Sequence, residues 1–171
     1  MLEYQKQDCE LTLREGLECY YQSFPESKEI LKDSAESGYL LRDHDCTHVI
    51  FGLDISIDQE AILDTWVLWG TSFKWKYLLT YAKLPQIKDL QKRLMNELGI
   101  KGFLGLYWNT LAIKRKVFFR TRKMKKKWPF QIPEEYLDMK ISDLREVHGI
   151  NILSTEDLNY IPTKWSGSIN N

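Results

Sequence analysis

The sequence predicts an all-α fold, a single-domain helical bundle built around a central helix rich in aromatic residues. Apolar residues recur at spacings of three and four rather than two, which is the period of an α-helix. Only 9 glycines and 5 prolines interrupt the 171 residues. A domain typically runs to about 100 to 200 residues. Because 43% of the residues are apolar, we expect residues 1–171 to bury one core and form one domain.

The first helices are bounded by residues that do not continue a helix. The apolar pattern over residues 11–21 predicts a helix that ends near Pro25, because the residue before a proline is disfavoured in the helical conformation. A short helix is expected over residues 26–34. The next helix is expected over residues 37–51, with Gly52 as the cap residue that ends it.

A serine followed three residues later by a glutamine, Ser56 and Gln59, predicts a capping box and the start of the central helix. Apolar residues then cover most of its circumference, as expected for a central or dimer-forming helix that continues to Pro85. Three further helices are expected, over 85–98 with Gly99 after it, over 103–119, and over 142–148 with Gly149 after it. A loop is expected at Pro129 and Pro133, and a disordered tail at 166–171.

Charge and cysteine content limit the partners and the cellular compartment that the sequence predicts. Lysine plus arginine equal aspartate plus glutamate, 24 against 24, so the net charge gives no reason to expect a nucleic-acid partner. Cys9, Cys19 and Cys46 lack the paired spacing of a disulfide framework, which favours free thiols in a reducing compartment. No apolar run is long enough for a secretion signal or a membrane span. We therefore expect a cytoplasmic protein.

Two histidines, His44 and His48, are four residues apart, so on a helix their rings share one face, with Cβ atoms about 6 Å apart. Glu60 lies in the first turn of the next expected helix and returns to the same point if the two helices are antiparallel. Asp45 can ligate at the edge of such a site or accept a proton from a ligating imidazole. This donor set suits zinc, and also iron or manganese.

Other interpretations of the histidine pair remain open. Histidines at this spacing often occur on a polar helix face without a metal, and carboxylates are common at helix starts because they complement the helix dipole. A zinc protease would place glutamate beside the first histidine, where this chain has Asp45. A histidine-aspartate phosphohydrolase needs another upstream histidine and a distant aspartate, and the only other histidine is His148.

The sequence around the histidine pair resembles the signature of the coenzyme Q biosynthesis factor four family, which is required for making ubiquinone. It reads "HDCTH" (His44, Asp45, His48), then "VIFGLDISIDQ", then Glu60. The approach "GYLLRD" and the late segment "YLDMKISDLREVHGI" also resemble that family, over roughly residues 10–150. The resemblance implies an all-α, usually dimeric protein that binds a metal, generally zinc, through the four residues named. It also implies membrane-associated handling of prenylated lipids and removal of a ring carboxyl group with hydroxylation there.

Large apolar residues after the motif can line a groove for a prenyl chain, or can simply form core or a dimer interface. They are Trp66, Trp69, Phe73, Trp75, Tyr77, Phe103, Leu104, Tyr107 and Trp108. The basic run "KRKVFFRTRKMKKKW", residues 114–128, departs from the family pattern. It suits an anionic membrane surface, with nucleic acid or an ordinary solvated surface as alternatives.

Two functions follow as expectations. The first is metal-dependent decarboxylation or hydroxylation of a prenylated quinone precursor at the membrane surface. The second is a non-catalytic prenyl-lipid-binding or scaffold protein with a structural metal. A helical protein that has drifted from the family and binds neither ligand is the third alternative.

Overall fold

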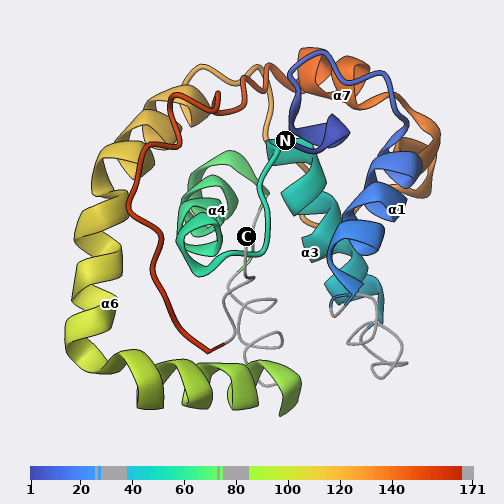
Figure 1. Cartoon of the computed structure of the whole chain (residues 1–171). Coiled ribbons are helices and arrows are strands. Elements are labelled where there is room, and N and C mark those ends of the chain that lie inside the picture. The colour runs from blue at the N-terminus through green and yellow to red at the C-terminus, as the bar shows by residue number, and fades with distance from the viewer. Residues whose placement is uncertain (26, 28–37, 73, 75–84, 167–171) are drawn as a thin grey trace.

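The structure is a computed structural model that describes residues 1–25, 27, 38–72, 74 and 85–166. It confirms the predicted all-α class, because the described residues form helices and no strand (Figure 1). In chain order the elements are η1 (Glu3–Gln5), α1 (Leu13–Ser23), α3 (Gly38–Phe51), α4 (Ile57–Gly70), α6 (Pro85–Thr121), η2 (Glu134–Asp138) and α7 (Ile141–His148). The helix expected over 26–34 lies outside the described residues.

The first two described α-helices end where the sequence predicts. Helix α1 stops at Ser23, just before Pro25, and begins with a capping box that Thr12 and Glu15 form. Helix α3 ends at Phe51, and Gly52 follows with φ +70°, a left-handed conformation that side-chain-bearing residues rarely adopt. This turn redirects the chain from α3 into α4.

Helix α4 begins at the predicted residue, but the predicted capping box is wrong. Ser56 makes no side-chain cap hydrogen bond. Asp54 supplies the capping side chain instead, and its Oδ1 accepts from the backbone N–H of Ser56 at 2.8 Å. The Gln59 amide donates to Oδ2 of Asp54 at 2.7 Å and accepts from the Asp54 backbone N–H at 2.9 Å. The turn before the helix is therefore closed by Asp54 and Gln59.

Helix α4 ends at Gly70, well before Pro85, so the predicted length of the central helix is also wrong. The carbonyl of Gly70 accepts from the backbone N–H of Trp128 at 2.9 Å, and the Ser72 N–H donates to the Trp128 carbonyl at 2.8 Å. These bonds to a distant segment replace the intrahelical bonds that would continue the helix.

Helix α6 contains both of the next two predicted helices. They meet at Gly99, whose φ of +56° and ψ of −175° are non-helical, so α6 bends sharply there (Figure 1). After the bend, α6 runs beside α4 in the same direction. Asn109 donates to Asp58 at 3.2 Å, and a Cβ at Gly70 would lie 3.1 Å from Thr121; both pairs are separated by 51 residues.

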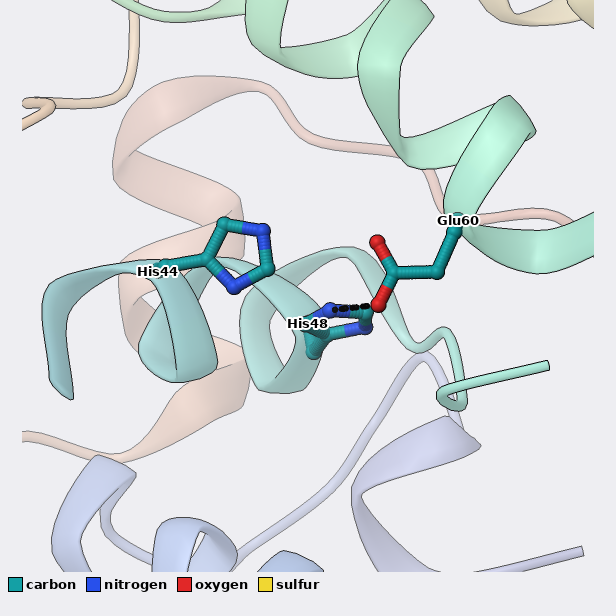
Figure 2. Close-up of side chains that lie close together, drawn as sticks. All are labelled: His44, His48 and Glu60. Atoms are coloured by element: carbon teal, nitrogen blue, oxygen red, sulfur yellow. Dashed lines mark ion pairs between the residues drawn. The ribbon is translucent and has the colours of Figure 1, made fainter. Parts of the chain in front are cut away.

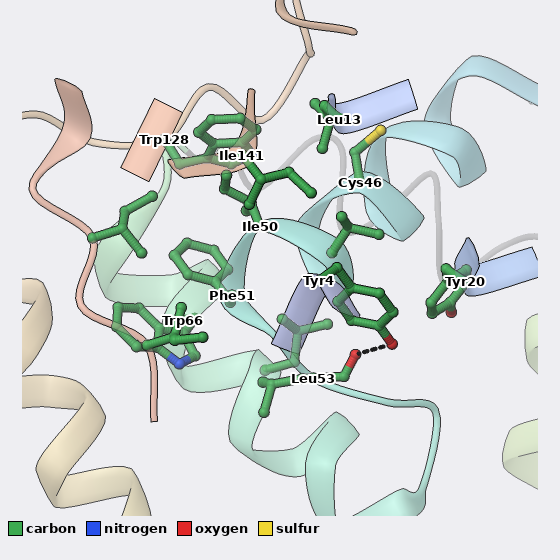
Figure 3. Close-up of a cluster of buried hydrophobic side chains, with 14 of the residues drawn as sticks. Tyr4, Leu13, Tyr20, Cys46, Ile50, Phe51, Leu53, Trp66, Trp128 and Ile141 are labelled. Atoms are coloured by element: carbon green, nitrogen blue, oxygen red, sulfur yellow. Dashed lines mark hydrogen bonds between the residues drawn. The ribbon is translucent and has the colours of Figure 1, made fainter. Parts of the chain in front are cut away.

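The core lies between α1, α3, α4 and α7 (Figure 3). The rings of Phe51 and Trp66 stack with their centroids 4.5 Å apart. The buried Tyr4 hydroxyl donates to the Leu53 carbonyl at 3.2 Å, which fixes the amino-terminal segment against the turn between α3 and α4. The packing therefore holds α3 and α4, which carry the predicted metal ligands, at a fixed position.

The fully buried guanidinium of Arg145, on α7, binds backbone carbonyls of two other segments. It donates to Val49 and Ile50 at 3.0 and 2.8 Å, near the carboxyl end of α3. It also donates to Tyr4 at 2.6 Å and to Lys6. Burial lowers the pKa of this guanidinium to about 10, so it stays charged at neutral pH. Arg145 thus joins α7, the end of α3 and the amino-terminal segment.

The segment after α7 runs along α6 (Figure 1). Asp157 forms ion pairs with Lys116 at 2.9 Å and Arg120 at 2.6 Å, and its hydrogen bond with Lys116 is the main reason that its pKa is well below the usual range. Further along, Ser166 donates to Glu97 at 2.8 Å. Ser166 is thus held by α6, and the rest of the predicted tail, 167–171, lies outside the described residues.

Candidate metal centre

Two adjacent helices bring His44, His48 and Glu60 together (Figure 2). The histidines lie one turn apart on α3, and the glutamate lies in the first turn of α4. One nitrogen of each imidazole and one carboxylate oxygen all lie within 4.8 Å of one another. The structure therefore places three of the four predicted ligands side by side.

His48 is fully buried, and both of its ring nitrogens lack a hydrogen-bond partner among the described residues. Its Nε2 lies 3.1 Å from Oε1 of Glu60, which is an ion-pair distance, but the contact lacks the geometry of a ring N–H hydrogen bond. A buried polar atom without a partner costs free energy. An ion bound between His48 and Glu60 would satisfy one of these nitrogens.

Asp45, the fourth predicted ligand, is not part of the converging group. The hydroxyl of Tyr21 donates to its Oδ2 at 3.0 Å, and Tyr20 lies 3.5 Å from its Oδ1. The same Oδ1 lies 3.8 Å from Nδ1 of His44. Burial and then the Asp45 charge raise the pKa of both tyrosines, so their hydroxyls remain protonated donors. Asp45 therefore lies beside His44 but outside the group of three converging residues.

The charges of the site depend on one another. Burial alone would lower the pKa of His44, but Asp45 and Glu60 outweigh it, and the pKa is raised. Burial alone would raise the pKa of Glu60, but the facing imidazoles outweigh it, and the pKa is lowered. The imidazoles and the Glu60 carboxylate therefore stabilise one another's charged forms, and a metal ion that binds here must displace the proton from His44.

The three residues fit a divalent metal ion. Two imidazole nitrogens and one carboxylate oxygen form a three-ligand zinc site, and iron and manganese accept the same donors. Two atoms that each bind zinc at about 2.1 Å lie about 3.4 Å apart when the ion is tetrahedral. The ligand atoms here lie within 4.8 Å of one another, so the widest pair must approach by as much as about 1.4 Å, which requires rotation of the side chains on binding.

Two residues near the site were missed by the sequence analysis. Asp64 lies one turn after Glu60 on α4, at the solvent-exposed edge of the site. Desolvation of the Asp64 carboxylate by the surrounding protein is the main cause that raises its pKa to about 6, and the negative charge of Glu60 adds to the effect. Its charge also interacts with that of Lys114 on α6. The spacing of four from Glu60 would have identified Asp64, whereas Lys114 comes close only through the packing of α6 on α4.

The predicted lipid-lining residues divide into three groups. Trp66 is fully buried in the core, and Phe103 is half-buried. Phe73, Trp75 and Tyr77 lie outside the described residues. The exposed members are Trp69 on α4 and Leu104, Tyr107 and Trp108 on α6. Trp108 is 67% exposed, and Ile100, one turn before Leu104, is 74% exposed, so α6 carries an apolar outer face.

The basic run over residues 114–128 is not one uniform surface. Val117 and Trp128 are buried, and Lys125 donates to the Glu146 carbonyl at 3.1 Å. Lys116 and Arg120 are paired with Asp157. This segment therefore contributes core residues and internal ion pairs as well as exposed cations.

No helix formed by the described residues has the length and apolar character of a bilayer-crossing segment. Comparison of the chain with protein-family models, curated proteins and solved structures found no match. The resemblance to the coenzyme Q biosynthesis factor four family therefore depends on the sequence motif that ends in Glu60 and on its neighbouring segments.

Proposed function

We propose that this chain is a metal-binding protein of the ubiquinone-biosynthesis type, which holds a prenylated quinone precursor or another prenyl lipid and supports ring decarboxylation or hydroxylation at a membrane surface. The observation that carries the proposal is the convergence of His44, His48 and Glu60 from two helices, together with the complete burial of His48, whose ring nitrogens make no hydrogen bond among the described residues. The metal is zinc, with iron or manganese as alternatives.

Each residue has a role in this proposal. His44, His48 and Glu60 hold the ion, and Asp45, itself held by two tyrosine hydroxyls, keeps the His44 ring in place. A divalent ion in this position supplies Lewis acidity toward the oxygen atoms of a ring carboxylate or hydroxyl. Glu60 is partly exposed, so the site is open to a ligand on that side.

Metal content tests the proposal. We expect purified protein to contain close to one metal ion per chain and the His44→Ala/His48→Ala variant to contain almost none, because only one ligand of the three remains. The control is His148→Phe, which removes the third histidine, on α7, without touching the site. Elemental analysis gives the ratio. A full complement of metal in the double variant would refute the assignment.

The apolar outer face of α6 supports contact with a membrane. It consists of the exposed residues Ile100, Leu104, Tyr107, Trp108 and Phe119. Residues 98–133 contain no acidic residue but many lysines and arginines, so this face is complementary to anionic lipid headgroups. The protein then lies peripherally on the cytoplasmic membrane, with the apolar side chains in the interface.

Vesicle flotation tests this contact. We expect Ile100→Ser/Trp108→Ser to bind vesicles of phosphatidylserine and phosphatidylcholine at least tenfold more weakly, because each large apolar side chain contributes about 1.5–3 kcal/mol when buried. The control Val147→Ser removes an exposed apolar side chain from α7. Equal binding by both variants would contradict the proposal. Self-association that the double variant abolishes would instead assign this face to a homodimer.

The second candidate function is a non-catalytic prenyl-lipid carrier or scaffold with a structural metal. The complete burial of His48 favours it, because an ion there would join α3 to α4. Mass spectrometry of lipid that copurifies with the protein, combined with an assay on a prenylated hydroxybenzoate, separates the two functions. Turnover favours the enzyme, and bound lipid without turnover favours the carrier.

A further inference from the structure

His148, the last residue of α7, is a buried histidine outside the candidate metal centre. It is 1% exposed, and neither nitrogen of its ring makes a hydrogen bond among the described residues. The rings of Trp128 and Tyr136 pack against it, with their centroids 5.0 and 5.8 Å from the centre of the imidazole. A neutral imidazole fits such an aromatic setting, whereas an imidazolium would be a buried charge without a counter-ion.

The charges around this imidazole also disfavour its protonated form. Burial is the main cause that lowers its pKa, and the ammonium of Lys126 adds to the effect. The backbone of Lys126 and of the residue after it opposes both only in part, and these contacts lack hydrogen-bond geometry. On α7 itself, Glu146 is exposed, and the Arg145 guanidinium binds carbonyls of Tyr4 and Ile50. No carboxylate of the described residues forms an ion pair with the ring.

The imidazole lies where residues 125–128 close onto two helices. The His148 carbonyl accepts from the backbone N–H of Lys125 at 2.9 Å, which joins this segment to the end of α7. At the other end of the segment, the Trp128 N–H donates to the carbonyl of Gly70, the last residue of α4, at 2.9 Å. The Trp128 ring, which contacts the imidazole, is fully buried. A charge on the ring of His148 would therefore act on the contact that holds this segment in place.

We propose that His148 is a pH-sensitive switch, whose neutral ring keeps residues 125–128 closed against α7 and α4 and whose protonation releases them. Release exposes the imidazole to water, so the open state binds a proton more readily than the closed state does. The closed state is therefore favoured at neutral pH and loses stability as the pH falls below about 6.5, the ordinary pKa of imidazole. Because opening takes up one proton, the open population grows by up to about tenfold for each pH unit.

Amide hydrogen exchange followed by NMR tests the switch at about pH 7 and about pH 5, on either side of the ordinary pKa of imidazole. The amides of Lys125 and Trp128 report on the segment. The Gly16 amide, which donates to Thr12 at 2.8 Å in α1, reports on the rest of the fold. After correction for intrinsic exchange rates, we expect the protection of both reporters to fall at least about tenfold relative to Gly16 at the lower pH.

Two neutral replacements, His148→Phe and His148→Gln, should remove this response, because neither side chain gains a proton between the two pH values. The same fall in protection in either folded variant would overturn the proposal, as would a wild-type protein whose reporters are equally protected at both pH values. The wild-type ring gives a check that needs no variant. A His148 imidazole that titrates by NMR at or above about 6.5 would contradict the switch, and one that titrates below this value would support it.

Lys126→Gln is a milder change, because it removes an exposed ammonium and leaves the ring in place. We expect it to raise the pKa of His148 toward the ordinary value and so to reduce the loss of protection at the lower pH. The matched control is Lys123→Gln, an exposed lysine that precedes the segment, and it should retain the full response. A larger loss of protection in Lys126→Gln than in this control would contradict the proposal.

Discussion

Replacing Arg145 with methionine is expected to lower the free energy of unfolding by about 3 kcal/mol, because each buried carbonyl left without a donor costs about 1–3 kcal/mol. The fully buried guanidinium donates to backbone carbonyls of Tyr4, Val49 and Ile50. Methionine fills similar space but donates nothing, so the Tyr4 and Ile50 carbonyls lose this donor away from water, whereas the Val49 carbonyl still accepts from the Gly52 N–H. The total stability of a domain is about 5–15 kcal/mol, so the variant loses a large fraction of it.

Urea denaturation followed by circular dichroism measures the effect. The matched control is Arg14→Met, because Arg14 pairs with Asp138 at 2.9 Å on the exposed surface. An exposed ion pair contributes about 0–1 kcal/mol, so this control should remain close to wild type. Arg145→Lys keeps the charge but has fewer donors in a different geometry, and should fall between the two. An Arg145→Met variant as stable as the control would show that the carbonyls find other partners.

Zinc is expected to raise the melting temperature of the wild-type protein by about 5–10 °C when its concentration is about 100-fold above the dissociation constant. Binding to the folded state alone contributes about 2.7 kcal/mol under these conditions. Each kcal/mol shifts the melting temperature of a domain of this size by about 2–4 °C. The ion stabilises the folded state because His48 and Glu60 come together only when α3 packs beside α4.

His48→Ala should abolish the zinc-dependent shift, because it removes the buried imidazole that faces Glu60 across the candidate site. Differential scanning calorimetry with and without a chelator measures it. Calcium is the control ion, since it prefers six to eight oxygen ligands and this site offers two nitrogens. A zinc-dependent shift of the same size in His48→Ala would mean that the ion binds elsewhere.

Local signals in the sequence predicted most helix boundaries. Pro25, Gly52, Gly99 and Gly149 each act on the backbone at their own position, so their effect does not depend on the rest of the fold. The approach of Glu60 to the histidines was also predictable, because it needs only a short turn between two helices. The structure agrees with the sequence in each of these cases.

Long-range contacts account for what the sequence analysis missed. Helix α4 stops at Gly70, where the backbone N–H of Trp128 donates to the Gly70 carbonyl, and no residue pattern within α4 predicts this contact. Arg145 stands among polar residues of a short helix and resembles a surface cation until the carbonyls around it are known. Lys114 belongs to a basic run in which the sequence does not distinguish one cation from the next. Their surroundings differ because α4 and the carboxyl-terminal segment contact different members of the run.

The spans of chain that these contacts close differ greatly. His44 and Glu60 belong to one helix–turn–helix unit, whereas Arg145 reaches partners 95 to 141 positions away in the sequence. The entropy lost when a loop closes grows with its length. Folding can therefore assemble the α3–α4 hairpin before α7 docks, so that the three residues of the candidate site come together early in folding.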